Sequence, residues 1–329
     1  MKKTLGYLAV AGLVATANAG SINVANFDIE LSGGIIAGYF YQNNVGTNNK
    51  DSFQIPTAAV DLKSEAKPIG FTVGIGVTDQ RTLINPVPEN KNVEFEYGWV
   101  TLKPVENLTI DAGKLLTNIG YELFHQYENK NHFFGVVWNA QPVAYAGARA
   151  TYTVMDGLDV YAEYSQNALD ASDAFAFGVL GSLDNISYAV SYFDEAGGKN
   201  IVDIVASTDL YSFEVGVNFD YIKLDDSAKV AGQDDSGWGL AVYASTKIAE
   251  EIEIPVRVEY ANDGTSDIYT DAGKYVWTFT VSPTYKPTKN TFARVELGYI
   301  KTDTKGFLDS NGTKKNNRFL AGAEVGFVF

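Results

Sequence analysis

The chain has no cysteine among its 329 residues and only two histidines. Disulfides and thiolate metal sites are therefore excluded, and a histidine-based metal site has little to draw on. Basic charge is also scarce, because 40 acidic residues outweigh 25 lysines and arginines and leave a net charge of −15. No basic footprint for a nucleic acid is present. Beyond the first segment, no apolar run approaches the ~20 residues that a membrane-spanning helix needs.

The first segment has the composition of a secretory signal peptide. Two lysines precede a short apolar stretch over 5–16, and small residues end at Ala19. This order predicts a signal peptide over 1–19, cleaved before Gly20, and a single domain over 20–329. The alternative is a transmembrane anchor, but the apolar stretch is too short to cross a bilayer as a helix.

The rest of the chain alternates between apolar and polar residues with the period of a β-strand. The runs are about 9–13 residues long, the length of a tilted strand that crosses a bilayer. Strands of soluble sandwiches usually stop near 5–6 residues, so we predict membrane-crossing strands rather than a soluble all-β protein. The predicted spans are 27–41, 52–62, 69–78, 93–102, 108–115, 142–154, 158–165, 174–182, 186–194, 200–207, 211–222, 237–246, 252–260, 275–285, 291–301 and 317–329.

Aromatic residues and connection lengths support the same interpretation. Large aromatic side chains gather near strand ends, as in the girdles at two membrane interfaces. The connections alternate between short turns and longer loops, as in barrels with periplasmic turns and external loops. The sequence therefore predicts an all-β, transmembrane antiparallel β-barrel of about 16 strands in a bacterial outer membrane. Pro56 interrupts the second run and neither face of that run is clearly apolar, so we expect a bulge or an edge irregularity there.

Two stretches carry a resemblance to a known family. They are Asp111-Ala-Gly-Lys-Leu-Leu-Thr-Asn-Ile-Gly-Tyr-Glu122 and Gln141-Pro-Val-Ala-Tyr-Ala-Gly147. Together they resemble the core of the outer-membrane β-barrel porin family of the OmpL-like type, over about 40 residues. The resemblance implies a porin, a passive water-filled channel for small hydrophilic solutes or ions in Gram-negative bacteria. Many porins of this kind are trimers, so it also implies a homotrimer.

The longest connection, 116–141, is the third external loop of the predicted barrel. In general porins this loop folds into the barrel and narrows it, and the layout here is similar. Its many apolar residues would be unusual on a solvated loop, so we predict that it folds into the lumen. The alternatives are a surface loop or an additional hairpin. Its titratable residues are Glu122, His125, Glu128, Lys130 and His132.

Four of the five arginines fall on the polar phase of a strand, so they should face the lumen. Two interpretations of these lumen-facing arginines remain open. The arginines could oppose acidic groups of the inserted loop across a constriction, or they could form a salt-bridge lattice that braces the wall. The predicted pore-lining and constriction residues are Glu122, His125, Glu128, Lys130, Arg149, Arg257, Arg294, Arg318, Glu163 and Glu214.

The C-terminus is the most specific local signal. The chain ends at Phe329 after alternating apolar residues that include Phe327, which resembles the terminal strand read by the barrel-insertion machinery. The other expected partners are outer-membrane lipid, lipopolysaccharide and small hydrophilic solutes.

Enzyme signatures such as G-x-S-x-G, H-E-x-x-H and the P-loop do not occur in the sequence. We therefore predict no enzyme, no catalytic residues, no cofactor and no metal site. The alternatives are a substrate-specific channel, an outer-membrane enzyme and a structural anchor.

Overall fold

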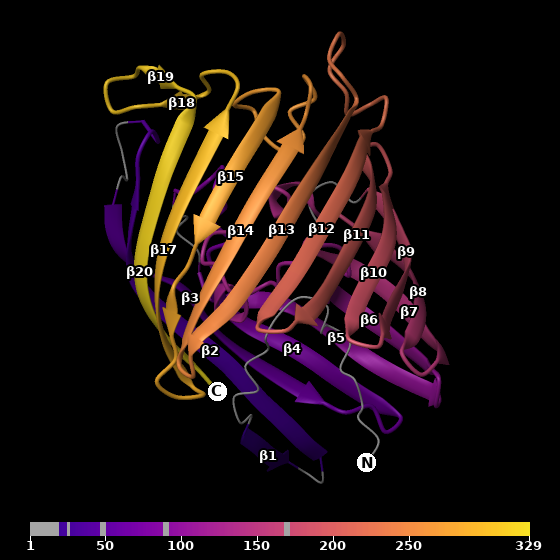
Figure 1. Ribbon diagram of the computed structural model, residues 1–329. Helices are drawn as coiled ribbons and strands as arrows, with labels where there is room; N and C mark the ends of the chain where they lie inside the picture. Colours follow the sequence, from indigo (N-terminus) through magenta and orange to yellow (C-terminus); the bar gives the residue numbers. More distant parts are fainter. Residues whose placement is uncertain (1–19, 25–26, 47–50, 88–91, 168–171) are drawn as a thin grey trace.

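The computed structural model describes residues 20–24, 27–46, 51–87, 92–167 and 172–329. Within these residues, 16 antiparallel strands pair in chain order and close into a barrel (Figure 1). The predicted all-β barrel and its strand number are confirmed. In the same part of the chain, no helix is long and apolar enough to cross a membrane.

The observed strands follow the predicted spans closely, and β4 has the predicted bounds. The barrel strands are β2 (Phe27–Gln42), β3 (Asp51–Ser64), β4 (Ile69–Thr78), β5 (Glu94–Val105), β6 (Leu108–Leu116), β7 (Ala144–Met155), β8 (Leu158–Gln166), β9 (Asp173–Leu183), β10 (Ile186–Glu195), β11 (Lys199–Leu210), β12 (Phe213–Leu224), β13 (Ser236–Ala249), β14 (Ile252–Asn262), β15 (Tyr275–Val281) continued by β16 (Thr284–Tyr285), β17 (Thr291–Thr302) and β20 (Asn317–Val328).

The barrel closes where the last strand meets the first. β20 pairs with β2 from Gly34 opposite Val328 to Gln42 opposite Leu320. Phe329 exchanges two main-chain hydrogen bonds with Gly33, of 3.0 and 3.1 Å, at the same seam. Because every barrel strand has two neighbours, no sheet edge is left for lipid to satisfy.

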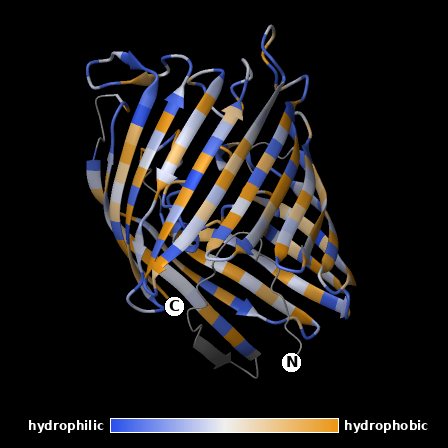
Figure 2. Cartoon of the chain, in the orientation of Figure 1, coloured by the Kyte–Doolittle hydropathy of each residue, from blue (hydrophilic) through white to orange (hydrophobic). Residues whose placement is uncertain are grey.

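Alternation separates the two faces of the wall. On β14, Glu253, Arg257 and Glu259 are buried inside, whereas the intervening Val258 is exposed outside. Figure 2 shows the same alternation of hydrophobic and hydrophilic residues along the strands around the barrel. An apolar outer face and a polar inner face are what a membrane barrel requires.

The connections keep the predicted alternation between short and long. Short turns such as 106–107 and 156–157 lie at the end of the barrel where the chain finishes, and longer loops lie at the opposite end (Figure 1). The bulge expected at Pro56 is present, since the register between β2 and β3 shifts there.

Several local features depart from the predicted spans. Proline at 283 interrupts the predicted strand 275–285 and divides it into β15 and β16. Tyr211 does not open a strand as predicted: it occupies the turn after β11 with a φ of 57°. An additional strand, β1 (Gly20–Val24), pairs with the start of β2, and the loop before β20 contains a small hairpin of β18 (Phe307–Leu308) and β19 (Lys314–Lys315).

The buried apolar core lies inside the barrel. Phe133, Val136 and Val137 of the connection between β6 and β7 are fully buried. They belong to one cluster with inward-facing Ile300 and Leu320 of the wall. Apolar connection residues thus pack against the inner face of β17 and β20.

Candidate functional site

The inner face of the wall carries the charged side chains that an apolar outer face excludes. Along β11–β20 seven of these side chains are almost completely covered by protein, with exposed fractions of 5% or less. They are Asp203, Asp220, Arg257, Glu259, Arg294, Glu296 and Glu324. Many of them are contacted by residues 117–143, the connection between β6 and β7, here called the inner segment.

The first limb of the inner segment is fixed to β11 and β13. The Gly120 amide donates a 3.2 Å hydrogen bond to Asp203, and the Tyr121 ring stacks on Tyr243 with centroids 4.0 Å apart. Gly120 has a φ of +94°, and a Cβ there would lie 2.1 Å from the side-chain oxygen of Gln141. Only glycine allows the two limbs of the segment to cross this closely.

Arg257 on β14 forms the central anchor of the inner segment. Its guanidinium is fully buried, donates a hydrogen bond to Glu122 of the segment, and lies 3.3 Å from Glu259 through Nε. The second oxygen of Glu122 accepts the Gly135 amide at 2.7 Å. Removing one partner of a buried ion pair is strongly destabilising, because the other charge is left desolvated and unpaired.

Two further arginines hold connections through main-chain oxygens. Arg294 donates to Glu324 at 2.6 Å and to the carbonyl oxygen of Asn129 at 2.6 Å. Arg318 donates to the carbonyl oxygen of Asn44 at 3.1 Å and to those of Leu83 and Ile84. These guanidinium groups use the multiple donors of arginine to fix loop backbone inside the barrel.

The remaining arginines are also engaged. Arg149 donates to Glu163 at 2.7 Å and to Asn118 at 3.2 Å, and Arg81 lies 3.0 Å from Asp79. The four strand arginines have the partners expected of a bracing lattice, the second of the two interpretations, and Arg81 is paired within its own connection. They stabilise connections against the wall and are not free charges facing water.

His132 bridges two charged groups of the interior. Its Nδ1 lies 2.6 Å from Glu324 and its Nε2 lies 3.2 Å from the Arg81 guanidinium. A guanidinium can only donate, so Nε2 accepts and Nδ1 carries the proton. Burial lowers the pKa of His132, which agrees with this neutral ring.

His125 has the opposite environment, although it is equally buried. Its Nε2 lies 3.0 Å from Glu96 and its Nδ1 lies 3.4 Å from Glu128, so both nitrogens face carboxylates. Burial alone would lower the pKa of His125, but the hydrogen bonds to Glu128 and Glu96 raise it to about 10. His125 is therefore an imidazolium near neutral pH.

Partly exposed carboxylates lie on the opposite side of the lumen. Asp61 on β3 accepts the Tyr97 hydroxyl, and Asp111 on β6 accepts the Thr101 hydroxyl at 2.6 Å. Glu128 of the inner segment exposes 31% of its side chain. Sequence reasoning omitted both residues. Asp111 lies on the polar phase of the predicted strand 108–115, whereas the predicted strand 52–62, which contains Asp61, has no clearly apolar face.

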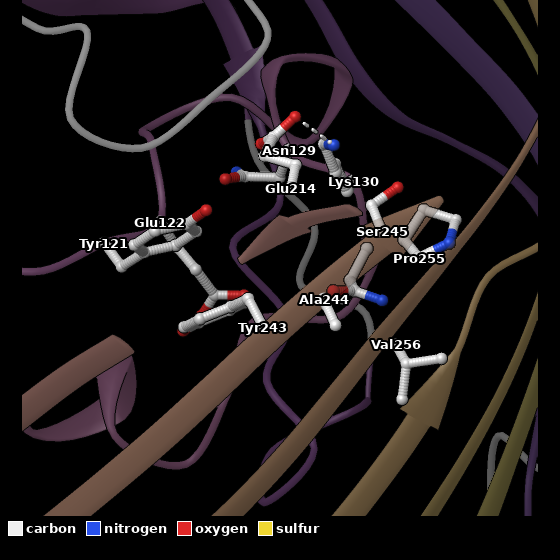
Figure 3. Close-up of a pocket in the computed structure, with 11 residues that line it drawn as sticks. Tyr121, Glu122, Asn129, Lys130, Glu214, Tyr243, Ala244, Ser245, Pro255 and Val256 are labelled. Carbon is white, nitrogen blue, oxygen red and sulfur yellow. Dashed lines mark hydrogen bonds and ion pairs between the residues drawn. The ribbon is translucent and has the colours of Figure 1, made fainter. Parts of the chain in front are cut away.

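A pocket opens between the inner segment and β12–β14 (Figure 3). Lys130 and Glu214 pair across it at 2.8 Å, with side chains 18% and 26% exposed. The predicted residues Glu122, Lys130 and Glu214 therefore come together here. The pocket is lined by Tyr121, Glu122, Asn129, Lys130, Asn131, Glu214, Tyr243, Ala244, Ser245, Pro255 and Val256.

The other predicted residues lie elsewhere. Phe327 is 46% exposed on the outer face of β20, and Phe329 is at the closing seam. Gly20 begins β1, whereas Ala19 lies outside the described residues. Among the described residues, no group of three or more acidic or histidine side chains is arranged to hold a metal ion.

Comparisons with known proteins agree with this architecture. A family model described as "Putative beta-barrel porin-2, OmpL-like" matches residues 28–329. No curated protein matches the sequence significantly.

Solved structures share the fold at low sequence identity. A trimer form of OmpT from Vibrio cholerae aligns with a TM-score of 0.64 and 11% identity, covering 92% of this chain and 99% of that one. An anion-selective porin from Comamonas acidovorans aligns with a TM-score of 0.65 and 11% identity, covering 92% of this chain and 100% of that one. A mutant of the Rh. blastica porin aligns with a TM-score of 0.57 and 14% identity, and the alignment also covers 92% of this chain and 100% of that one.

Proposed function

This chain belongs to the beta-barrel porin-2, OmpL-like family, and on that premise we propose that it forms a water-filled channel for passive diffusion of small hydrophilic solutes or ions across a bacterial outer membrane. The observation that carries the proposal is the separation of faces: apolar side chains outside and charged side chains inside a closed wall of 16 strands. A barrel of this size is too wide for its own side chains to fill. Family membership favours a channel over an enzyme.

The inner segment forms the constriction of the proposed channel. Its contacts reach several sides of the wall, including Glu96 on β5, Arg257 on β14 and Glu324 on β20. A segment held on several sides reduces the free cross-section more than one folded against a single strand. Solute size is therefore limited at the height of residues 117–143.

Single-channel conductance in planar bilayers tests the proposal. Purified folded protein should give discrete current steps, because the barrel supplies a continuous aqueous path. The same preparation after boiling, shown to be unfolded by its altered gel migration, is the matched control and should give none. Folded protein that inserts into the bilayer without conductance steps would contradict the proposed function.

The remaining expectations concern processing, assembly and partners. Signal-peptide removal would place the mature terminus at Gly20, which N-terminal sequencing of the membrane form tests. Insertion would use the terminal strand, whose Phe327 is exposed on the outer face. A homotrimer is the proposed assembly, with outer-membrane lipid and lipopolysaccharide around it. Support comes from the similar fold of the OmpT form described as a trimer.

A further inference from the structure

We propose that the channel conducts cations in preference to anions, and that Asp61, Asp111 and Glu128 set this preference. The inference rests on the proposed function, since it names the class of solute that the pore favours. It depends on one contrast inside the barrel: which charged side chains meet water in the lumen and which are covered.

The arginine charge of β14, β17 and β20 is largely hidden from the lumen. Arg257 is fully buried, Arg294 is 3% exposed and Arg318 is 7% exposed. Each is also engaged by a carboxylate or by main-chain oxygens. A passing anion would have to displace these contacts to reach the guanidinium groups, so they contribute little to anion attraction.

Carboxylates around β3–β5 retain an excess of negative charge. Asp61, Glu96 and Glu128 surround His125: Glu96 and Glu128 lie 3.0 and 3.4 Å from its ring nitrogens, and Asp61 interacts with the ring electrostatically. Even with His125 protonated, three carboxylates face one imidazolium. Glu96 is nearly buried, whereas Asp61 and Glu128 are partly exposed to the lumen.

The backbone of β5 is shaped to hold this group. The register between β4 and β5 shifts beside Gly74, which places both Glu96 and Tyr97 on the inner side. A bulge commonly redirects a side chain in this way. The Tyr97 ring lies over Gly74, where a Cβ would be 2.5 Å from it, and its hydroxyl holds Asp61 in place.

Asp111 extends the negative strip to β6. It lies opposite Arg149 in the sheet register, but Arg149 is already paired with Glu163 at 2.7 Å. One guanidinium therefore faces two carboxylates. The Thr101 hydroxyl orients Asp111 from the neighbouring strand.

The charge balance of this side of the lumen is negative overall. The inner-face positions of β3–β8, with the segment residues that contact them, carry seven carboxyl groups and four basic groups. The carboxyl groups are Asp61, Glu94, Glu96, Asp111, Glu128, Asp159 and Glu163, and the basic groups are Lys63, Lys103, His125 and Arg149. A pore wall of one sign raises the local concentration of the opposite ion.

Reversal potential under a KCl gradient tests the inference. The reversal potential of the wild-type channel should have the sign expected for cation preference. The preference should be larger in dilute salt, where screening is weaker. The triple variant Asp61→Asn, Asp111→Asn, Glu128→Gln keeps the hydrogen-bond acceptors and removes three charges. Its cation-to-anion permeability ratio should fall about twofold or more.

A matched control removes three exposed carboxylates from the short turns: Glu106→Gln, Glu250→Gln and Glu251→Gln. Its permeability ratio should change less than that of the triple lumen variant. If the triple lumen variant does not fold, the single variants Asp61→Asn and Glu128→Gln should each lower the ratio by a smaller step.

Two outcomes would overturn the inference while leaving the pore intact. One is a wild-type reversal potential of zero or of anion sign. The other is an equal cation-to-anion permeability ratio in the wild type and in the lumen variants. Absence of any conductance in the wild type would instead contradict the proposed function.

Discussion

The inner wall has two sides that differ in how they use charge. On β14, β17 and β20, Arg257, Arg294 and Arg318 are buried and bound to carboxylates or loop carbonyls. On β3 and β6, Asp61 and Asp111 are partly exposed and held by hydroxyl groups. We call the inner face of β14, β17 and β20 the arginine side and the inner face of β3 and β6 the acidic side.

The difference separates structural charge from functional charge. A covered ion pair fixes the position of a connection, and its loss leaves a desolvated partner. A partly exposed carboxylate costs little to maintain and still acts on ions in the lumen. The buried arginines and the partly exposed aspartates all lie on the inner face of their strands. Their burial therefore distinguishes them, whereas their position in the alternating sequence does not.

The largest expected effect is loss of the central anchor. Arg257→Met would leave Glu122 and Glu259 buried without their guanidinium partner, which should lower the free energy of unfolding by about 3–5 kcal/mol. Urea unfolding followed by gel migration measures the loss. The exposed pair of Lys229 and Asp226 offers the control Lys229→Met, which should leave the unfolding midpoint unchanged. A midpoint for Arg257→Met equal to that control would argue against a bracing role.

A second test concerns His125, which lies in the connection between strands. Its folded pKa of about 10 is above the ordinary value of 6.5. Its stabilising contribution is therefore complete below pH 6.5 and is lost as pH rises through about 10, by on the order of a few kcal/mol. Thermal unfolding from neutral to alkaline pH should show this loss in the wild type. His125→Asn should show a flatter profile, and an identical slope in both proteins would refute the assignment.

A third and smaller effect belongs to the acidic side. Gly74→Val would place side-chain atoms where the Tyr97 ring lies, and overpacking of this kind costs about 1–3 kcal/mol. Because Tyr97 positions Asp61, cation preference should fall together with stability. Gly232 lies in open space but has a φ of +84°, so Gly232→Asn is the tolerated control. Unchanged stability and selectivity in Gly74→Val would contradict the role of Gly74 in making room for the Tyr97 ring.

The smallest effect is expected at the pocket. Lys130 and Glu214 form a partly exposed ion pair, so Lys130→Met should change the free energy of unfolding by only about 0–1 kcal/mol. Single-channel conductance should still change, because the pair spans the space between the inner segment and the wall. A large loss of stability would place this pair among the structural charges of the arginine side.

Strand positions could be predicted from the sequence because the membrane imposes a simple rule on each residue. Apolar residues must alternate with polar ones over a bilayer-crossing length, and β4 shows the predicted bounds. Pro56 likewise predicted a local irregularity, and the register shifts there. The strand break at 283 was missed because flanking residues on both sides keep the alternation.

The roles of the inner residues could not be predicted in the same way. Arg257 and Asp61 both lie on the inner face of the barrel, yet one is fully buried and the other is partly exposed. The difference arises from contacts with residues far away in sequence, such as Glu122 for Arg257. The inward position of Glu96 depends on a bulge, which no local pattern indicates.

Thiol labelling tests the central claim most directly, because the chain has no cysteine of its own. Single cysteines would replace Thr101 and Asp111 on the inner face and the adjacent Val100 and Ala112 on the outer face, in protein reconstituted into liposomes. A membrane-impermeant, water-soluble thiol reagent should label positions 101 and 111 rapidly and positions 100 and 112 hardly at all. Equal labelling of neighbouring positions, or labelling of the outer pair alone, would contradict a lipid-facing exterior around an aqueous lumen.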